Sequence, residues 1–240
     1  MMAGVREAGE TGIHVGTVLR DTVAVFARNA VAFTAVGLLS SLPTLALDAM
    51  TGVDTGRTVA LVADIVLGLM IACVCQAMIV DAACESMARR PVRMARSVAR
   101  GVKRALPVLG VSFLSVLFIV LGLLVLIVPG VIVALIVSVA IPACVIEDLG
   151  PFDSLRRSDE LTSGFRWRIF GVLALFTIAT WIGNTLVQAL YGVVAPWAGL
   201  VLEALWTGVD VAVNAIVAAV LYVALRAAKR SDATEPSATG

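Results

Sequence analysis

The stretch VLGVSFLSVLFIVLGLLVLIV, residues 108–128, contains no charged residue and decides the class of this protein. A run of roughly 18 or more apolar residues is long enough to cross a bilayer core of about 30 Å. In lipid, the backbone polar groups must be bonded within the protein, which leaves helices and closed barrels. A barrel strand would alternate polar and apolar residues, and this run does not. It therefore predicts a membrane-spanning helix.

Similar runs recur along the chain, and 60% of its 240 residues are hydrophobic, against roughly 45–50% in a soluble domain. We expect an all-α polytopic membrane protein with one six-helix domain over residues 1–230. The polar residues 231–240 should form a disordered cytoplasmic tail. The polar leader is too long for the first run to belong to a secretory signal peptide. The six spans are expected at residues 29–48, 58–80, 106–128, 131–146, 169–190 and 200–225.

The positions of lysine and arginine predict the orientation. Cytoplasmic loops of membrane proteins carry an excess of these residues. With six spans and a cytoplasmic N-terminus, 17 of the 18 basic residues lie on the cytoplasmic side, and only Arg57 lies outside. This division predicts a protein of the bacterial inner membrane with both termini in the cytoplasm.

Pro129 and Gly130 separate the third and fourth spans with almost no polar loop. Pro-Gly favours a tight turn, and the fourth span is short. Two full crossings or a kinked re-entrant hairpin both fit, and both return the chain to the cytoplasm.

Three cytoplasmic segments, at residues 13–29, 92–104 and 151–164, have the pattern of helices lying on the membrane surface. In the second, we expect Val98 and Val102 on an apolar face and arginines on the opposite face. The third has Pro151 in its first turn and Gly164 at its end. Helices packed on cytoplasmic loops are the alternative. Each segment precedes two spans, which suggests a threefold repeat of one surface helix and two spans.

The sequence shows no catalytic machinery. It contains one histidine, His14, and no G-x-S-x-G turn or phosphate-binding loop. Histidine and cysteine residues do not cluster as zinc ligands do, so we expect no metal and no cofactor. The net charge of +1 gives no indication of nucleic-acid binding.

Polar residues inside the predicted spans form a candidate intramembrane face. Ionisable groups there are costly and usually face the interior of a helix bundle. Hydrogen bonds between packed helices explain them best, and a polar pathway for a proton, ion or solute is the alternative. The residues of this face are Asp210, Asn214, Glu203, Asn184, Gln188 and Asp64.

A second set of residues is expected to contact lipid headgroups, through basic side chains and a tryptophan at the membrane interface. Anionic lipids are the expected partners, at about 1 kcal/mol for each cation near the surface. The loop between residues 147 and 168 also carries five acidic residues, so a charge network that locks the loop is favoured there over a substrate site. The expected headgroup contacts are Arg93, Arg96, Arg100, Lys103, Arg104, Arg166, Trp167 and Arg168.

Residues 127–175 also resemble a bacterial six-pass membrane group that includes the YciC-like proteins and the membrane domain of glycerophosphoryl diester phosphodiesterases. The shared pattern is a Pro-Gly turn, an apolar span, an acidic-Gly-Pro stretch, a Leu-Arg-Arg-Ser helix and an aromatic-basic start of the next span. It matches here at Pro129, Gly130, Pro142, Glu147, Gly150, Pro151, Leu155, Arg156, Arg157, Ser158, Leu161, Thr162, Gly164, Trp167, Arg168 and Gly171.

The resemblance implies a six-helix membrane fold without an assigned activity. The phosphodiesterase activity belongs to a separate soluble hydrolase domain, which this sequence does not contain. We therefore expect a non-enzymatic membrane protein, such as an envelope or lipid-associated scaffold. The alternatives are a small transporter component that uses the intramembrane polar face and, less favoured, a membrane enzyme acting on lipid. A homo-oligomer and a membrane-protein partner both stay open.

Overall fold

A computed structural model describes residues 15–39, 58–88, 94–191 and 195–234, and every regular element in these ranges is an α-helix. In chain order these are α1 (Val15–Arg28), a helix at Ala30–Leu39, α3 (Thr58–Met87), α4 (Met94–Val125), α5 (Ile127–Val137), α6 (Ala140–Ile146), α7 (Pro151–Thr162), α8 (Arg166–Tyr191) and α9 (Pro196–Thr234). The all-α prediction is confirmed for this part of the chain.

Five helical stretches in the described residues are long and apolar enough to cross a membrane. The count rises to six if α1 and the helix Ala30–Leu39, which meet at 86°, are taken as one broken span. The coarse prediction of a multi-helix membrane fold is therefore supported. The first predicted span is described only as far as Leu39, so six crossings stay a prediction, as does the threefold repeat.

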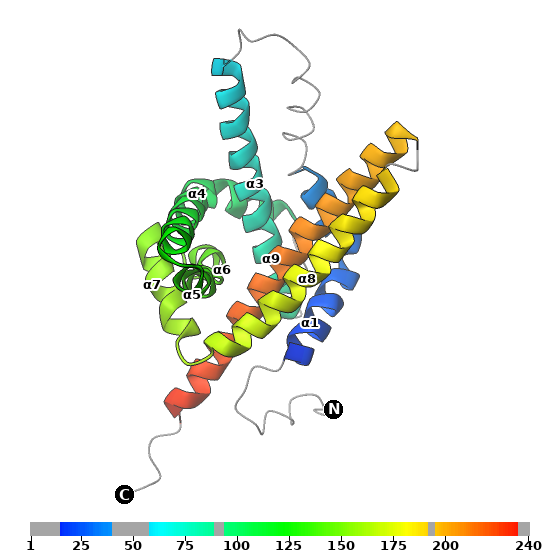
Figure 1. Ribbon diagram of the computed structural model, residues 1–240. Helices are drawn as coiled ribbons and strands as arrows, with labels where there is room; N and C mark the ends of the chain where they lie inside the picture. The colour runs from blue at the N-terminus through cyan, green and yellow to red at the C-terminus, as the bar shows by residue number, and fades with distance from the viewer. Residues whose placement is uncertain (1–14, 40–57, 89–93, 192–194, 235–240) are drawn as a thin grey trace, which may run out of the picture.

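The long helix α9 forms the centre of the bundle and packs against α8, α3 and α1 (Figure 1). Its buried side has small residues such as Ala212 and Ala215 beside larger ones such as Ile216. Small residues let helix backbones approach closely in a membrane bundle. A close crossing lies between Gly37 and Gly208, where a Cβ on Gly37 would overlap the Gly208 carbonyl.

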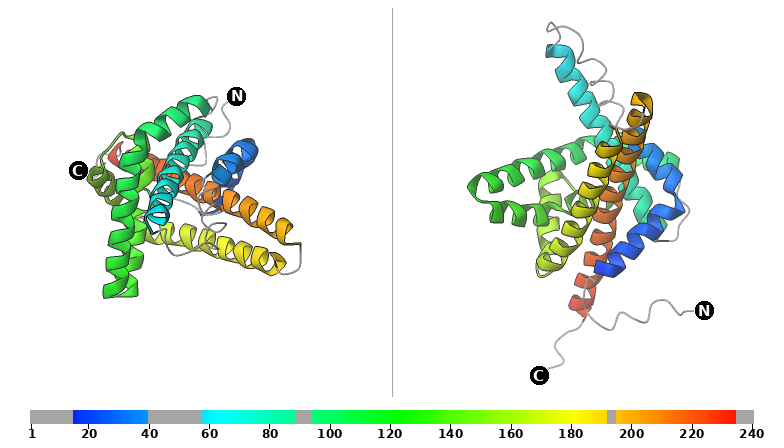
Figure 2. Two further views of the ribbon diagram at one scale, coloured as in Figure 1. Left: turned by 90° about the horizontal axis from the view of Figure 1, so that it is seen from above. Right: turned by 45° about the vertical axis from the view of Figure 1, so that its right-hand side comes forward.

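The α4–α5 hairpin does not run alongside the other long helices. It is seen nearly end-on in Figure 1, where α3, α8 and α9 lie across the view, and it projects sideways from them in Figure 2. The stretches Ser97–Val125 and Ile127–Ile146 are each long and apolar enough to cross a membrane. Two full crossings and a re-entrant hairpin both stay open for residues 106–146.

The predicted turn at Pro129-Gly130 is displaced. The chain breaks at Leu126, and both residues lie in the first turns of α5. Proline is well tolerated in the first turn of a helix, where its missing N–H has no intrahelical partner. The same residue can therefore mark a helix start as well as a turn.

The predicted surface helix at residues 92–104 is also different from expectation. It continues into the third span as the single helix α4, which contains Pro107 and changes direction along its length (Figure 2). Val98 and Val102 are exposed, and the buried positions are Ser97, Gly101 and Ala105. The face that packs on the protein is thus the one next to the expected apolar face.

The two other predicted surface segments are helical, as α1 and α7, and their position on the membrane surface stays a prediction. Pro151 occupies the first turn of α7, and Gly164 follows its end with a φ of 89°. At the other end of the chain, α9 continues to Thr234, so four residues of the predicted disordered tail are helical.

Candidate functional site

The most connected polar group is Glu147, which lies between α6 and α7. Its Oε1 accepts a hydrogen bond from the Tyr222 hydroxyl at 2.6 Å, and its Oε2 accepts one from Arg157 Nε at 3.0 Å. The Arg226 Nε lies 3.9 Å from Oε1, and its guanidinium stands 5.9 Å from the centre of the Tyr222 ring. One carboxylate therefore joins α7 and α9 to the end of α6.

Local chain geometry positions this carboxylate. Asp148 adopts a φ of 59°, which ends the run of α6, and Pro151 starts α7 three residues later. The Ser154 hydroxyl donates to the Gly150 carbonyl at 2.7 Å and closes the first turn. The tight connection brings Arg157, two turns into α7, back to Glu147.

The environment keeps Glu147 ionised. Burial by itself would raise the pKa of this carboxyl, but the hydrogen bonds from Tyr222 and Arg157, with the charges of Arg157 and Arg226, lower it below its ordinary value. Burial would likewise lower the pKa of Arg157, and the carboxylates of Glu147 and Glu160 raise it. A carboxylate held in this way serves as an electrostatic clamp and is poorly suited to donate a proton near neutral pH.

A second carboxylate, Asp81 on α3, is 1% exposed. It forms an ion pair with Arg100 on α4 and accepts a hydrogen bond from Ser97 Oγ at 3.0 Å. One helical turn beyond Arg100, Arg104 pairs with Asp148. Asp148 follows Glu147 in the sequence, so the contacts of Glu147 and the ion pairs of Asp81 and Asp148 form one continuous set.

We call this set the charged layer. It joins the C-terminal halves of α3 and α9 and the end of α6 to the N-terminal part of α4 and the middle of α7. Its members are Asp81, Arg100, Arg104, Glu147, Asp148, Arg157, Tyr222 and Arg226.

The candidate intramembrane face is only partly assembled. Asp210 Oδ1 accepts hydrogen bonds from Thr180 Oγ1 on α8 and from Asn214 Nδ2, each at 2.9 Å. Glu203 is half-buried. Asn184 and Gln188 are exposed, so they do not join Asp210.

The partner of Asp210 on α8 is therefore Thr180, which the sequence pattern did not indicate. The side chain of Asp64 lies outside the described residues. Asp210 is half-buried and accepts from Thr180 on the neighbouring helix and from Asn214 one turn further along its own helix. This arrangement is typical of a packing contact between helices.

The expected headgroup contacts divide into two groups. Arg100 and Arg104 turn inward to carboxylates of the charged layer, and Arg166 pairs with Asp159 at 3.0 Å. Lys103 and Arg168 are exposed.

Trp167 is 86% exposed and stands edge-on to Phe170. Its exposure fits a position at the surface of the protein. Arg93 and the side chain of Arg96 lie outside the described residues.

Sequence reasoning missed Asp81 and Tyr222. The second span was expected to end at residue 80, which placed Asp81 in a loop, but α3 continues to Met87. An acidic residue within an apolar helix is a usable signal for an internal ion pair. For Tyr222, one of two tyrosines in the chain, no pattern indicated a partner 75 residues away.

Within the described ranges, no three histidine, cysteine, aspartate or glutamate side chains group as metal ligands would. The structure thus defines a helical protein with several apolar helices compatible with a membrane and a charged layer at one end of them.

A family model described as a domain of unknown function (DUF7847) matches residues 60–230, and the chain belongs to this family. No curated protein and no solved structure gives a significant match.

Proposed function

We propose that this protein is a non-enzymatic integral protein of the bacterial inner membrane that acts as a lipid-associated scaffold. Its charged layer faces the cytoplasm, and exposed residues at its margin contact anionic headgroups. The resemblance of residues 127–175 to six-pass membrane groups agrees with this assignment.

The charged layer is the observation that carries the proposal. It gathers the ends of five helices whose adjoining segments are the ones rich in arginine and lysine. Two segments on the same side of a membrane are connected by an even number of crossings. Basic loops that all lie on one side require the same. The ion pairs support a common side for these helices' ends, and the excess of arginine and lysine in the adjoining segments favours the cytoplasm as that side.

The state of the carboxylates supports a non-catalytic role. Asp81 and Glu147 are both engaged by arginine and by a hydroxyl donor. A general acid or base must exchange its proton in the working pH range, and the pKa of Glu147 is held below its ordinary value. The arrangement stabilises the join between helices.

Reporter fusions test the orientation. A fusion after Lys103 should give a cytoplasmic signal, and fusions at Gly52 and Ala195 should give an exterior signal. An exterior signal at Lys103 would refute the proposed orientation.

Lipid analysis tests the partner. The protein is extracted with its surrounding lipids by a styrene–maleic acid copolymer, and its anionic lipid fraction is compared with that of the whole membrane. We expect enrichment that falls in the variant Lys103→Gln and persists in Lys103→Arg, which keeps the charge. No enrichment in the wild type would refute the lipid contact.

A further inference from the structure

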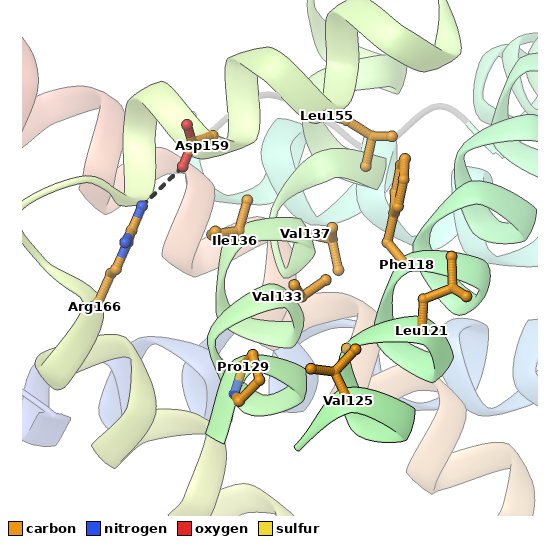
Figure 3. Close-up of a pocket in the computed structure, with 11 residues that line it drawn as sticks. Phe118, Leu121, Val125, Pro129, Val133, Ile136, Val137, Leu155, Asp159 and Arg166 are labelled. Carbon is orange, nitrogen blue, oxygen red and sulfur yellow. Dashed lines mark hydrogen bonds and ion pairs between the residues drawn. The ribbon is translucent and has the colours of Figure 1, made fainter. Parts of the chain in front are cut away.

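An apolar groove runs along the α4–α5 hairpin and ends beside α7 and the start of α8 (Figure 3). Its volume is about 660 Å³. Its long sides are formed by Phe118, Leu121 and Val125 of α4 and by Pro129, Val133 and Ile136 of α5.

Close contact between the two helices shapes this groove. At Gly122 the backbones approach so closely that a Cβ would lie 2.9 Å from the Gly130 Cα. Glycine has no side chain to fill the space between the two helices there. The larger residues of α4 and α5 lie beside this contact and form the sides of the groove. At the far end, Ser158 of α7 hydrogen-bonds the Ile136 carbonyl and holds Leu155 against the groove.

The end of the groove beside α8 is polar. Arg166 Nη2 lies 3.0 Å from Asp159 Oδ1, and both residues line the groove (Figure 3). The Arg166 Nε is buried and has no hydrogen-bond partner. The Arg166 side chain as a whole is 43% exposed, so the accessible part of its guanidinium is in position to bind a ligand. The two charges at this end sum to zero.

We propose that the groove binds one acyl chain of a phospholipid whose headgroup carries a phosphate and a primary ammonium. The phosphate accepts hydrogen bonds from the accessible part of the Arg166 guanidinium, and the ammonium donates to Asp159. An anionic headgroup without an ammonium would place its charge beside the Asp159 carboxylate. A quaternary ammonium has no N–H to donate to that carboxylate.

The dimensions fit this occupant. Residues 129–137 of α5 cover eight rises of about 1.5 Å, or about 12 Å. Half of a bilayer core measures about 15 Å, so the groove shields most of one acyl chain. The inference rests on the proposed function only in requiring that the hairpin lies in lipid.

The test uses the full chain, delipidated in detergent, with phosphatidylethanolamine, phosphatidylcholine or phosphatidylglycerol added at equal concentration. Bound lipid is counted by native mass spectrometry. We expect phosphatidylethanolamine to bind on the order of tenfold more tightly than the other two, the ratio of one charge-assisted hydrogen bond. Equal retention of the three lipids, or preference for phosphatidylglycerol, would overturn the proposal.

Three variants and one control locate the site. Arg166→Gln and Asp159→Asn should each remove the preference, and Arg156→Gln, an exposed arginine on the same α7 helix, should keep it. Val133→Trp should fill the groove and reduce retention of all three lipids while Arg166 is intact. Retention unchanged in both Arg166→Gln and Val133→Trp would exclude the groove.

Folding of each variant is checked by its thermal unfolding temperature. The preference for phosphatidylethanolamine is measured independently of the enrichment of anionic lipids that depends on Lys103. Either proposal can therefore fail while the other holds.

Discussion

Replacing Arg100 with methionine should destabilise the protein more than any other single change to an arginine of the charged layer. Methionine keeps most of the length and apolar volume of the side chain and removes only the guanidinium. Its partner Asp81 is 1% exposed and would keep a negative charge inside the helix bundle. The Ser97 hydroxyl, at 3.0 Å, also donates a hydrogen bond to Asp81.

The magnitude follows from the burial of the partner. Removing one member of a buried ion pair costs about 3–5 kcal/mol, because the remaining charge is uncompensated. The neutral hydrogen bond from Ser97 contributes about 1 kcal/mol and cannot replace the cation. With roughly 2–4 °C per kcal/mol for a chain of this size, the unfolding temperature should fall by about 6–20 °C.

The assay is thermal unfolding in detergent, followed by the fluorescence of the four tryptophans. Lys103→Met is the matched control, since Lys103 is exposed on the same helix, and it should change the unfolding free energy by less than about 0.5 kcal/mol. The double variant Asp81→Asn with Arg100→Met should recover part of the loss, because no charge is then buried. If Arg100→Met unfolds at the same temperature as Lys103→Met, the reasoning from a buried ion pair is wrong.

Three further predictions concern other contacts. Gly208→Leu should destabilise the fold by about 1–3 kcal/mol, because a Cβ there would meet the Leu38 amide nitrogen at 3.0 Å. The control Gly16→Ala, which has open space around it, should be neutral or stabilising by up to about 1 kcal/mol. Thermal unfolding of both variants checks this prediction. Because the pKa of Glu147 is lowered in the folded protein, its carboxylate contributes stability above the ordinary glutamate pKa of about 4.3, and this stability is lost as the pH falls through the folded pKa. Unfolding temperatures measured from about pH 6 to pH 3 should therefore fall less steeply in Tyr222→Phe than in the wild type. An equally steep fall in both proteins would contradict the clamp. Asp210→Asn keeps an oxygen that can accept from Thr180 and should cost only about 0.6 kcal/mol; a lost uptake phenotype at unchanged stability would instead favour the transporter alternative.

The helices were predictable where the physical signal is local. Uninterrupted apolar runs such as residues 108–128 allow only helices in lipid, and α4, α5, α8 and α9 follow from them. The start and end of α7 were predictable for the same reason, since Pro151 and Gly164 restrict the backbone dihedrals at their own positions.

Pairings between distant segments were not predictable. Asp81 and Arg100 lie 19 residues apart, and Glu147 and Tyr222 lie 75 apart, so no periodicity relates them. The second surface helix shows a related difficulty. Its hydrophobic pattern identifies a face that avoids water, but a side chain such as Val98 avoids water equally well against lipid as against protein. Only packing selects which face meets α3, and that face has Gly101 because its neighbour Met78 lies close.

The basic residues at the membrane boundary therefore carry two roles that a sequence count combines. An arginine flanking a span contributes to orientation whether it reaches a headgroup or a carboxylate, since either contact keeps its charge on one side of the membrane. Three of these arginines bind carboxylates: Arg100 pairs with Asp81, Arg104 with Asp148 and Arg157 with Glu147. Counting lysine and arginine hence does not distinguish a contact with lipid from a contact with a carboxylate. The chain carries 17 acidic residues for 18 basic ones, and this near balance allows arginines of the charged layer to pair with carboxylates while other cations in the described part of the chain, such as Lys103, stay exposed.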